Sequence, residues 1–171
     1  MVDIPTKAID STVDFSDCKK FRYSLCRNFG AGKGSINFIM LNPSTADLVH
    51  NDPTIHRCEQ RAIAEGFEQM VITNIFAYRA TEPKDMKAFY AKKPRKEYEI
   101  NFDKIRGFAE SSDKIICAWG NHGALMNTAD KVRDVLKPYQ KKVFYLKLNK
   151  SGEPQHPLYL AASLEAVNWK F

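Results

Sequence analysis

The stretch Ile36-Asn-Phe-Ile-Met-Leu41, followed at once by Asn42-Pro43-Ser44-Thr45, sets the interpretation of the whole chain. A short apolar run that stops at polar, turn-forming residues is typical of a buried strand. Two further runs have the same character, Val71-Ile-Thr-Asn-Ile-Phe76 and Lys114-Ile-Ile-Cys-Ala-Trp119, and Val143-Phe-Tyr-Leu146 is a shorter fourth. The sequence therefore predicts four buried strands.

Helix-forming signals lie between these strands. Asp52-Pro53 combines a residue type favoured at the helix N-cap with proline at the first helical position, and predicts a helix to about Glu65, before Gly66. Further helices are expected over residues 83–110, over residues 120–136 and after His156-Pro157. Strands that alternate with helices in this way predict an α/β fold, a three-layer α/β/α sandwich with a mostly parallel central sheet.

The segment before these strands carries two further patterns. Phe21-Arg-Tyr-Ser-Leu-Cys-Arg27 alternates between apolar and polar residues, as a half-exposed strand does. Gly30-Ala-Gly-Lys-Gly34 lacks the spacing and the Lys-Ser/Thr ending of a phosphate-binding P-loop, so we interpret it as a hairpin turn. With 171 residues the chain suits a single domain over 1–171, in which residues 1–19 can form a peripheral N-terminal segment.

Composition and charge exclude several classes of protein. With 44% hydrophobic residues the chain can bury a sizeable core, so it is not intrinsically disordered. It has no apolar run of about 18 residues and no basic flank before an apolar block near Met1, so we expect no membrane span, no signal peptide and a cytoplasmic location. The net charge of +6 suits a polyanionic partner without requiring one.

Cysteine and histidine spacing gives no sign of a metal site. The four cysteines lie far apart and form no CxxC pair, and the four histidines show no HExxH pattern. Without a secretory signal the cysteines are expected to be reduced thiols. We therefore expect no metal and no cofactor.

The polar residues of interest lie where the predicted strands end. Ligands of α/β sheets bind outside the carboxyl ends of the strands. We therefore expect the polar side chains beyond these ends to meet at one edge of the sheet. They are Asn42, Asn74, Arg79, Asn121, His122 and His156.

The segment after the first strand is a candidate for catalysis. Asn42 precedes Pro43, which restricts the backbone of both residues, so its amide is held rigidly and can position a water or read a heterocycle. Ser44, Thr45 and Asp47 add two hydroxyls and a carboxylate nearby. An ordinary Asn-Pro turn that ends a strand is an equally weighted interpretation.

The segment after the second strand is a candidate for binding. Asn74 lies in an apolar strand, so its amide needs a hydrogen-bond partner, either backbone or a ligand. Phe76 and Tyr78 are either core residues or a stacking platform. Arg79 suits either a phosphate contact or a surface ion pair.

Two later segments complete the candidates. Asn121 and His122 follow Gly120, where a small-residue turn either approaches a ligand or packs a helix tightly. His156 precedes Pro157 at an expected helix start, where the helix dipole disfavours a protonated ring. A neutral His156 could donate a hydrogen bond to a developing oxyanion, although a lone histidine is more often structural.

The motif series LNPSTAD, NDPT, TNIFAYRAT, AWGNHG and HPLYL, over residues 20–160, resembles a little-characterised bacterial and phage domain family. The series is also similar to that of the uracil-DNA glycosylase superfamily. This resemblance implies that Asn42, beside Pro43, positions the attacking water, that Asn74 reads the base, and that His156 stabilises the leaving base. It also places Pro157, Leu158 and Tyr159 at the segment that penetrates DNA.

The resemblance implies a monofunctional DNA glycosylase that flips a base out of the stack and hydrolyses its N-glycosidic bond. Asp47 could assist Asn42, while Arg57 and Arg79 could contact phosphates. Met40, where the superfamily has glycine, and the lack of serines in HPLYL favour a base other than uracil. A hydroxymethylated or glucosylated cytosine of phage DNA, removed in antiviral defence, is the substrate we expect.

Two other functions remain open. One is a nucleotide or nucleoside hydrolase, or a transferase, that acts on a free small molecule at the same edge of the sheet. The other is a nucleic-acid-binding module without catalysis. DNA is the expected partner, and we infer no obligate protein partner.

Overall fold

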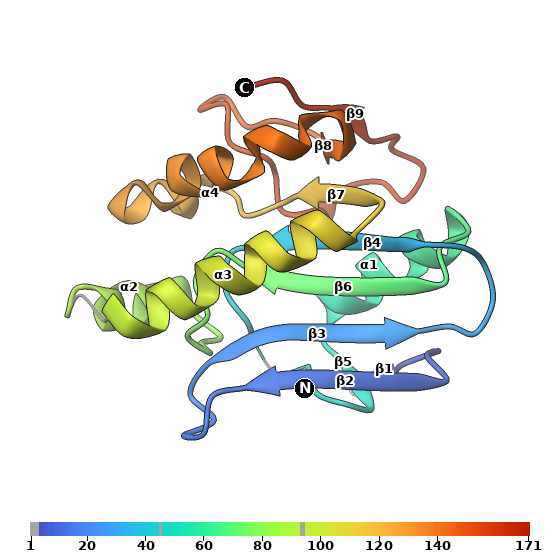
Figure 1. Cartoon of the computed structure of the whole chain (residues 1–171), viewed down its shortest axis with the longest axis horizontal. Coiled ribbons are helices and arrows are strands. Elements are labelled where there is room, and N and C mark those ends of the chain that lie inside the picture. Colours follow the sequence, from blue (N-terminus) through green and yellow to red (C-terminus); the bar gives the residue numbers. More distant parts are fainter. Residues whose placement is uncertain (1–3, 45, 93–94) are drawn as a thin grey trace.

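The computed structural model describes residues 4–44, 46–92 and 95–171. Seven strands of the described chain form one sheet in the order β2-β3-β6-β4-β7-β8-β9, and β1 pairs with β5 separately (Figure 1). The strands are β1 (Ile4–Pro5), β2 (Asp10–Phe15), β3 (Arg22–Asn28), β4 (Ser35–Met40), β5 (His50–Asn51), β6 (Gln69–Asn74), β7 (Lys114–Cys117), β8 (Val143–Tyr145) and β9 (Val167–Asn168).

The sheet is mixed. The four predicted buried strands are present as β6, β4, β7 and β8, and they pair in parallel at its centre. Strands β2 and β3 add antiparallel pairs on one side, and β9 adds one on the other. The predicted α/β class is thus confirmed, but a mostly parallel sheet is not, because three of its six pairings are antiparallel. Part of the segment 1–19 belongs to the sheet as β2.

Helices lie against both faces of the sheet. Figure 1 shows α3 and α4 in front of it and α1 behind. Within β4, Ile39 packs with residues of α3 and α4, whereas Phe38 packs with residues of α1, as alternation in a strand requires. The helices are α1 (Pro53–Ala64), α2 (Pro83–Tyr90), α3 (Arg95–Ser111) and α4 (Thr128–Leu136), and the 3-10 turns are η1 (Asn121–Asn127), η2 (Lys137–Lys142) and η3 (Pro157–Tyr159).

The start of α1 confirms its sequence prediction. Asp52 is the N-cap, and its carboxylate accepts a hydrogen bond of 2.9 Å from the backbone N–H of Ile55. Pro53 occupies the first turn, where it needs no hydrogen-bond donor. The Asp-Pro motif therefore fixes both the beginning of α1 and the direction of the Asp52 carboxylate.

Two helix predictions need correction. The helix expected over 120–136 is α-helical only from Thr128, because Met126 and Asn127 adopt left-handed φ values of 57° and 55°. The C-terminal helix is wrong, since only η3 forms before the chain returns to the sheet as β9. Arg57 and Arg61 donate hydrogen bonds to carbonyls between Leu158 and Leu164, and these contacts take the place of helical hydrogen bonds.

Two predictions for the N-terminal strands also fail. Strand β3 is largely buried rather than half-exposed, because it pairs on both sides and the 46–51 loop covers the side chains of Arg22 and Arg27. The glycine segment is not a hairpin, since β6 lies between β3 and β4. Gly32 packs there against the Gly66 backbone, and a Cβ atom would lie 2.5 Å from the Gly66 oxygen.

None of the helices in the described part of the chain is both long enough and apolar enough to cross a membrane.

Candidate functional site

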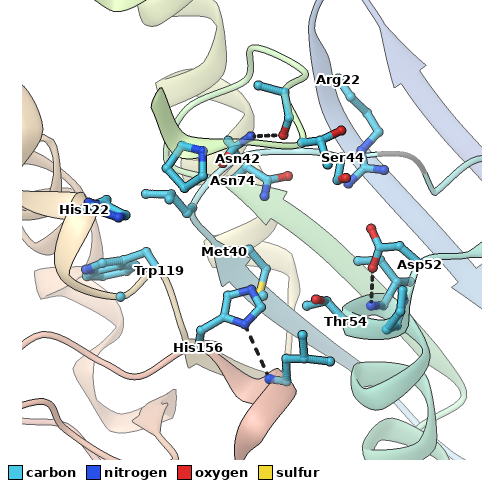
Figure 2. Close-up of a pocket in the computed structure, with 18 residues that line it drawn as sticks. Arg22, Met40, Asn42, Ser44, Asp52, Thr54, Asn74, Trp119, His122 and His156 are labelled. Atoms are coloured by element: carbon cyan, nitrogen blue, oxygen red, sulfur yellow. Dashed lines mark hydrogen bonds between the residues drawn. The ribbon is translucent and has the colours of Figure 1, made fainter. Parts of the chain in front are cut away.

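A pocket opens at the carboxyl ends of β4, β6 and β7 (Figure 2). Its volume of about 470 Å³ falls within the range of small-molecule sites, roughly 300–1,000 Å³. Six residues expected from the sequence line it: Asn42, Ser44, Asn74, His122, His156 and Leu158. These side chains therefore meet at the edge of the sheet where the predicted strands end, as expected from the sequence.

Among the other residues that line the pocket, Arg22, Asp52, Thr54 and Trp119 were not expected at the site from the sequence, and Met40 was considered only as the residue that stands where the superfamily has glycine. Asp52 had a sequence signal, but only as a helix cap. Arg22 had none, because an arginine in an alternating strand is expected to face solvent. Figure 2 shows Arg22 and Ser44 on the same side of the pocket as Asn74, and His156 on the opposite side.

Asn42 links the end of β4 to the segment that follows β6. Its amide nitrogen donates hydrogen bonds to the carbonyl oxygens of Ala80, at 2.7 Å, and Pro43, at 3.2 Å. Among the described residues its amide oxygen has no hydrogen-bond partner. Two hydrogen bonds to backbone carbonyls thus hold the side chain, and its amide oxygen can accept a hydrogen bond from a water or a ligand.

Asn74 is buried with an unsatisfied acceptor. Only 2% of the residue is exposed, and its amide oxygen has no hydrogen-bond partner in the described part of the chain. Its backbone carbonyl is occupied, since Asn101 donates a hydrogen bond of 2.8 Å to it. A buried polar atom left unpaired costs about 1–3 kcal/mol, and a ligand donor in the pocket would remove that cost.

His156 is held as a neutral donor. The backbone N–H of Leu158 donates a hydrogen bond of 3.4 Å to Nδ1 of the ring, so the proton of the neutral ring lies on Nε2 (Figure 2). Burial lowers the pKa of His156, and the charge of Asp52 opposes this shift. The sequence argument named the helix dipole as the cause, but η3 has only three residues, and burial is the main cause.

Arg22 is a buried cation. It is 1% exposed, and one guanidinium nitrogen donates a hydrogen bond of 2.9 Å to the carbonyl oxygen of Ala46. Its Nε is buried without a partner in the described residues. Burial lowers the pKa of Arg22 to about 10, which leaves the guanidinium charged at neutral pH.

Asp47 and Pro43, also expected at the site, do not line the pocket. Asp47 is exposed and caps a turn, accepting hydrogen bonds of 2.9 Å from the backbone N–H groups of Val49 and His50. Pro43 is buried, and its carbonyl accepts a hydrogen bond from the Ala80 N–H. Thr45 lies outside the described residues.

Two aromatic residues expected at the site pack elsewhere. Phe76 is fully buried in the core and packs against Tyr90, with ring centroids 4.7 Å apart. Tyr78 stacks on Phe89, with centroids 4.1 Å apart and planes within 3° of parallel. Neither side chain lines the pocket, so neither forms a stacking platform inside it.

Four of the residues expected to contact DNA divide into two groups. Arg57 points inward and donates to the carbonyl oxygens of Leu158 and Leu160, while Pro157 is buried. Tyr159 is 88% exposed, and Asn121 is exposed beside Ser151, whose hydroxyl donates to it at 2.7 Å. Of these four residues, Tyr159 and Asn121 are free to meet a large ligand.

An open basic groove adjoins the pocket. Lys19, Lys20 and Arg79 line it, and three residues, Ser44, Ala80 and Thr81, belong to both the groove and the pocket. Arg79 lies over the Phe15 ring, 5.0 Å from its centroid, and donates to the Lys19 carbonyl. The groove therefore carries positive charge up to the mouth of the pocket.

The carboxylate and imidazoles that line the pocket, from Asp52, His122 and His156, are not arranged to hold a metal ion. Over the ranges that the structure describes, no group of three or more His, Cys, Asp and Glu side chains could hold a metal ion. The pocket's polar groups are two amides, three hydroxyls, one carboxylate, one guanidinium, two imidazoles and one indole.

A family model described as "Protein of unknown function (DUF1643)" matches residues 22–158. The chain belongs to the DUF1643 family. The DUF1643 region begins at Arg22 and ends at Leu158, so it contains every residue that lines the pocket. Comparisons with curated proteins and with solved structures found no match to this chain.

Proposed function

We propose that this DUF1643 protein is a monofunctional DNA glycosylase of the uracil-DNA glycosylase-like superfamily, and that the pocket receives a flipped, modified pyrimidine. The observation that carries the proposal is the unpaired amide oxygen of buried Asn74, in the same pocket as a neutral His156 donor. A pyrimidine edge presents donors and acceptors side by side. An acceptor from Asn74 and a donor from His156 suit such an edge.

The reaction is hydrolysis of the N-glycosidic bond. The bond between the anomeric carbon and the base nitrogen breaks, and its electron pair leaves with the base. A water oxygen bonds to the anomeric carbon and loses one proton, and the released base takes up a proton. The products are a free base and an abasic site.

Three side chains have roles in this step. The free amide oxygen of Asn42 holds the attacking water. Asp52 is the carboxylate that lines the pocket, so it replaces Asp47 as the group that takes the proton from water. His156 donates from Nε2 to the base as negative charge develops there, a form of electrostatic catalysis.

Polymeric DNA is the proposed substrate because of the groove. Lys19, Lys20 and Arg79 present cations along a path that ends at the pocket, as contacts to a phosphate backbone require. Exposed Tyr159 adjoins Leu158 at the pocket and could fill the space that a flipped base leaves. A free nucleotide would make no use of the groove.

The base we propose is a modified pyrimidine, such as hydroxymethylated or glucosylated cytosine of phage DNA. The pocket volume of about 470 Å³ exceeds what an unmodified base needs, which leaves space for a substituent. Removal of such a base would act in antiviral defence. We further propose that residues 1–171 act as one cytoplasmic domain without an obligate protein partner.

A hydrolase of free nucleotides is the second candidate, and buried Arg22 favours it, because a guanidinium in a pocket suits a phosphate. The test is incubation with DNA duplexes and single strands that carry uracil, mismatched thymine, hydroxymethylcytosine or glucosylated cytosine. Alkali then reveals abasic sites, and mass spectrometry detects free base. Release of one base supports the proposal, whereas turnover of nucleoside monophosphates without release from DNA contradicts it.

A further inference from the structure

We propose that Arg22 is a second catalytic group, a fixed cation that binds the anionic form of the base as it leaves. This inference rests on the proposed function and assigns a role to a residue that the glycosylase resemblance does not include. It predicts that the pocket prefers a pyrimidine anion to the neutral pyrimidine.

The burial of Arg22 is the first observation. A guanidinium that is 1% exposed has lost nearly all its hydration, and burying a charge is costly unless it is paired. A guanidinium has five N–H groups; Nη1 of Arg22 donates to Ala46, and its buried Nε has no hydrogen-bond partner among the described residues. A ligand in the pocket would supply the missing acceptors.

The charges around Arg22 are the second observation. Asp52 raises its pKa, but the two side chains form no ion pair, and Arg27 and Arg79 lower its pKa by repulsion. Figure 2 shows the Arg22 side chain beside Ser44, directed toward the side of the pocket where Asp52 lies. The cation therefore remains uncompensated by a direct carboxylate contact.

The chemistry of bond cleavage explains why a second donor is useful. When the glycosidic electron pair moves to the base, negative charge spreads from the ring nitrogen to the exocyclic oxygens. His156 is neutral and supplies one hydrogen bond, whereas Arg22 supplies a full positive charge in a site shielded from water. Fixed charges aimed at developing charge in such a site are the largest electrostatic contribution to many enzymes.

Arg27 is a matched control in the same strand. It is also buried, but its guanidinium donates to the carbonyls of Asp47, Leu48 and His50 and to the Asn51 amide. It does not line the pocket. Arg27→Gln thus removes a buried cation that supports the same loop without touching the ligand.

The experiment uses 5-fluorouracil as the probe, because fluorine withdraws electron density and lets the pyrimidine anion form closer to neutral pH. Binding to the full-length protein is measured by calorimetry across the ionisation of the probe, for wild type, Arg22→Lys, Arg22→Gln and Arg27→Gln. Base release is measured in parallel under single-turnover conditions, on the DNA from which wild type releases a base in the panel of substrates described above. Inorganic pyrophosphate is the comparison ligand.

We expect wild type, Arg22→Lys and Arg27→Gln to bind more tightly as the probe ionises, and Arg22→Gln to lose this preference. Base release by Arg22→Gln should fall about 100- to 1,000-fold, the usual cost of removing an oxyanion donor. If Arg22→Gln does not fold, binding of the neutral and anionic probe is measured on His156→Gln instead. The anion preference must persist there, because Arg22 keeps its charge.

Four results overturn the proposal. If wild type binds the neutral and anionic probe equally, Arg22 does not bind the anion. The same conclusion follows if His156→Gln loses the preference for the anionic probe. If Arg22→Gln releases base as fast as wild type, the glycosylase proposal still holds, but the role of Arg22 is only to bind the Ala46 carbonyl. Pyrophosphate binding that depends on Arg22, with no base release from any DNA, contradicts both proposals together and identifies a phosphate site.

Discussion

The backbone N–H of Leu158 donates a hydrogen bond of 3.4 Å to Nδ1 of His156, and this contact fixes which ring nitrogen faces the pocket with a proton. Protonation of the ring would place a proton on Nδ1, opposite the N–H of Leu158. Both the hydrogen bond and the burial of the ring therefore favour the neutral form.

This arrangement predicts a pH dependence of folding. The pKa of His156 is lowered in the native state, mainly by burial, so the unfolded chain binds more protons at mildly acidic pH. The stability contributed by the neutral ring is complete above the ordinary histidine pKa of about 6.5 and declines as the pH falls below it, until the native ring is protonated. We expect urea unfolding to show this decline in wild type.

The decline should be smaller in His156→Gln, because that variant lacks the His156 ring. Some decline should remain, because burial also lowers the pKa of His122, which the variant keeps. An identical pH dependence of the free energy of unfolding in wild type and His156→Gln would contradict the assignment.

Asn74 should control the rate of base release, whereas Asn101 should control the stability of the fold. Asn74→Ala removes an unpaired acceptor, so we expect base release to fall at least 100-fold with little loss of stability. Asn101→Ala removes the donor to the carbonyls of Asn74 and Ile75, and should cost about 1–3 kcal/mol in the free energy of unfolding. Thermal and urea unfolding beside single-turnover assays separate the two, and equal loss of stability in both variants would argue against an unsatisfied Asn74.

Asp52 and Asp47 form a second contrast. Asn caps a helix about as well as Asp, so Asp52→Asn should preserve α1 and yet slow base release at least tenfold, because an amide cannot take a proton. Asp47→Asn should leave the rate within about threefold of wild type. The Asp47 carboxylate faces solvent and contacts the backbone N–H groups of Val49 and His50 and the His50 ring, and neither of these residues lines the pocket. Initial rates of base release at saturating enzyme measure both effects. A larger loss of rate in Asp47→Asn than in Asp52→Asn would show that Asp47 takes the proton from water.

The basic groove should determine how binding depends on salt. Each side-chain cation that neutralises a phosphate of duplex DNA adds about 0.9 to the slope of log K against log salt. Replacing Lys19 and Lys20 together by alanine should therefore reduce the slope by nearly two. Arg57→Ala should leave it unchanged, because Arg57 binds backbone carbonyls of the chain itself. Fluorescence anisotropy at several salt concentrations measures both, and a reduced slope in Arg57→Ala would contradict its inward placement.

Local sequence signals predicted the elements that depend on neighbouring residues. The apolar runs that became β4, β6, β7 and β8, and the Asp52-Pro53 start of α1, needed no knowledge of the rest of the fold. The meeting of Asn42, Asn74 and His156 followed from strand ends that share one edge of a sheet.

Features set by distant contacts were not predictable. Asp47 and Asp52 lie close in sequence, and which one faces the pocket depends on a loop held by Arg27 and by the buried contact of Asn51 with Glu59. Arg22 alternates like an exposed residue, and only the packing of the 46–51 loop over β3 buries it. The prediction of a C-terminal helix was wrong for the same reason, because arginines of α1, far away in the sequence, bind the backbone carbonyls of that segment.

The most direct test of the glycosylase account is the stoichiometry of its two products on one DNA substrate. Free base, measured by mass spectrometry, and alkali-labile sites, measured on the same sample, should appear in equal amounts with wild type and disappear together in Asn74→Ala and His156→Ala. Free base in equal amounts from wild type and both variants would contradict the site. The absence of free base from every modified DNA would contradict the function.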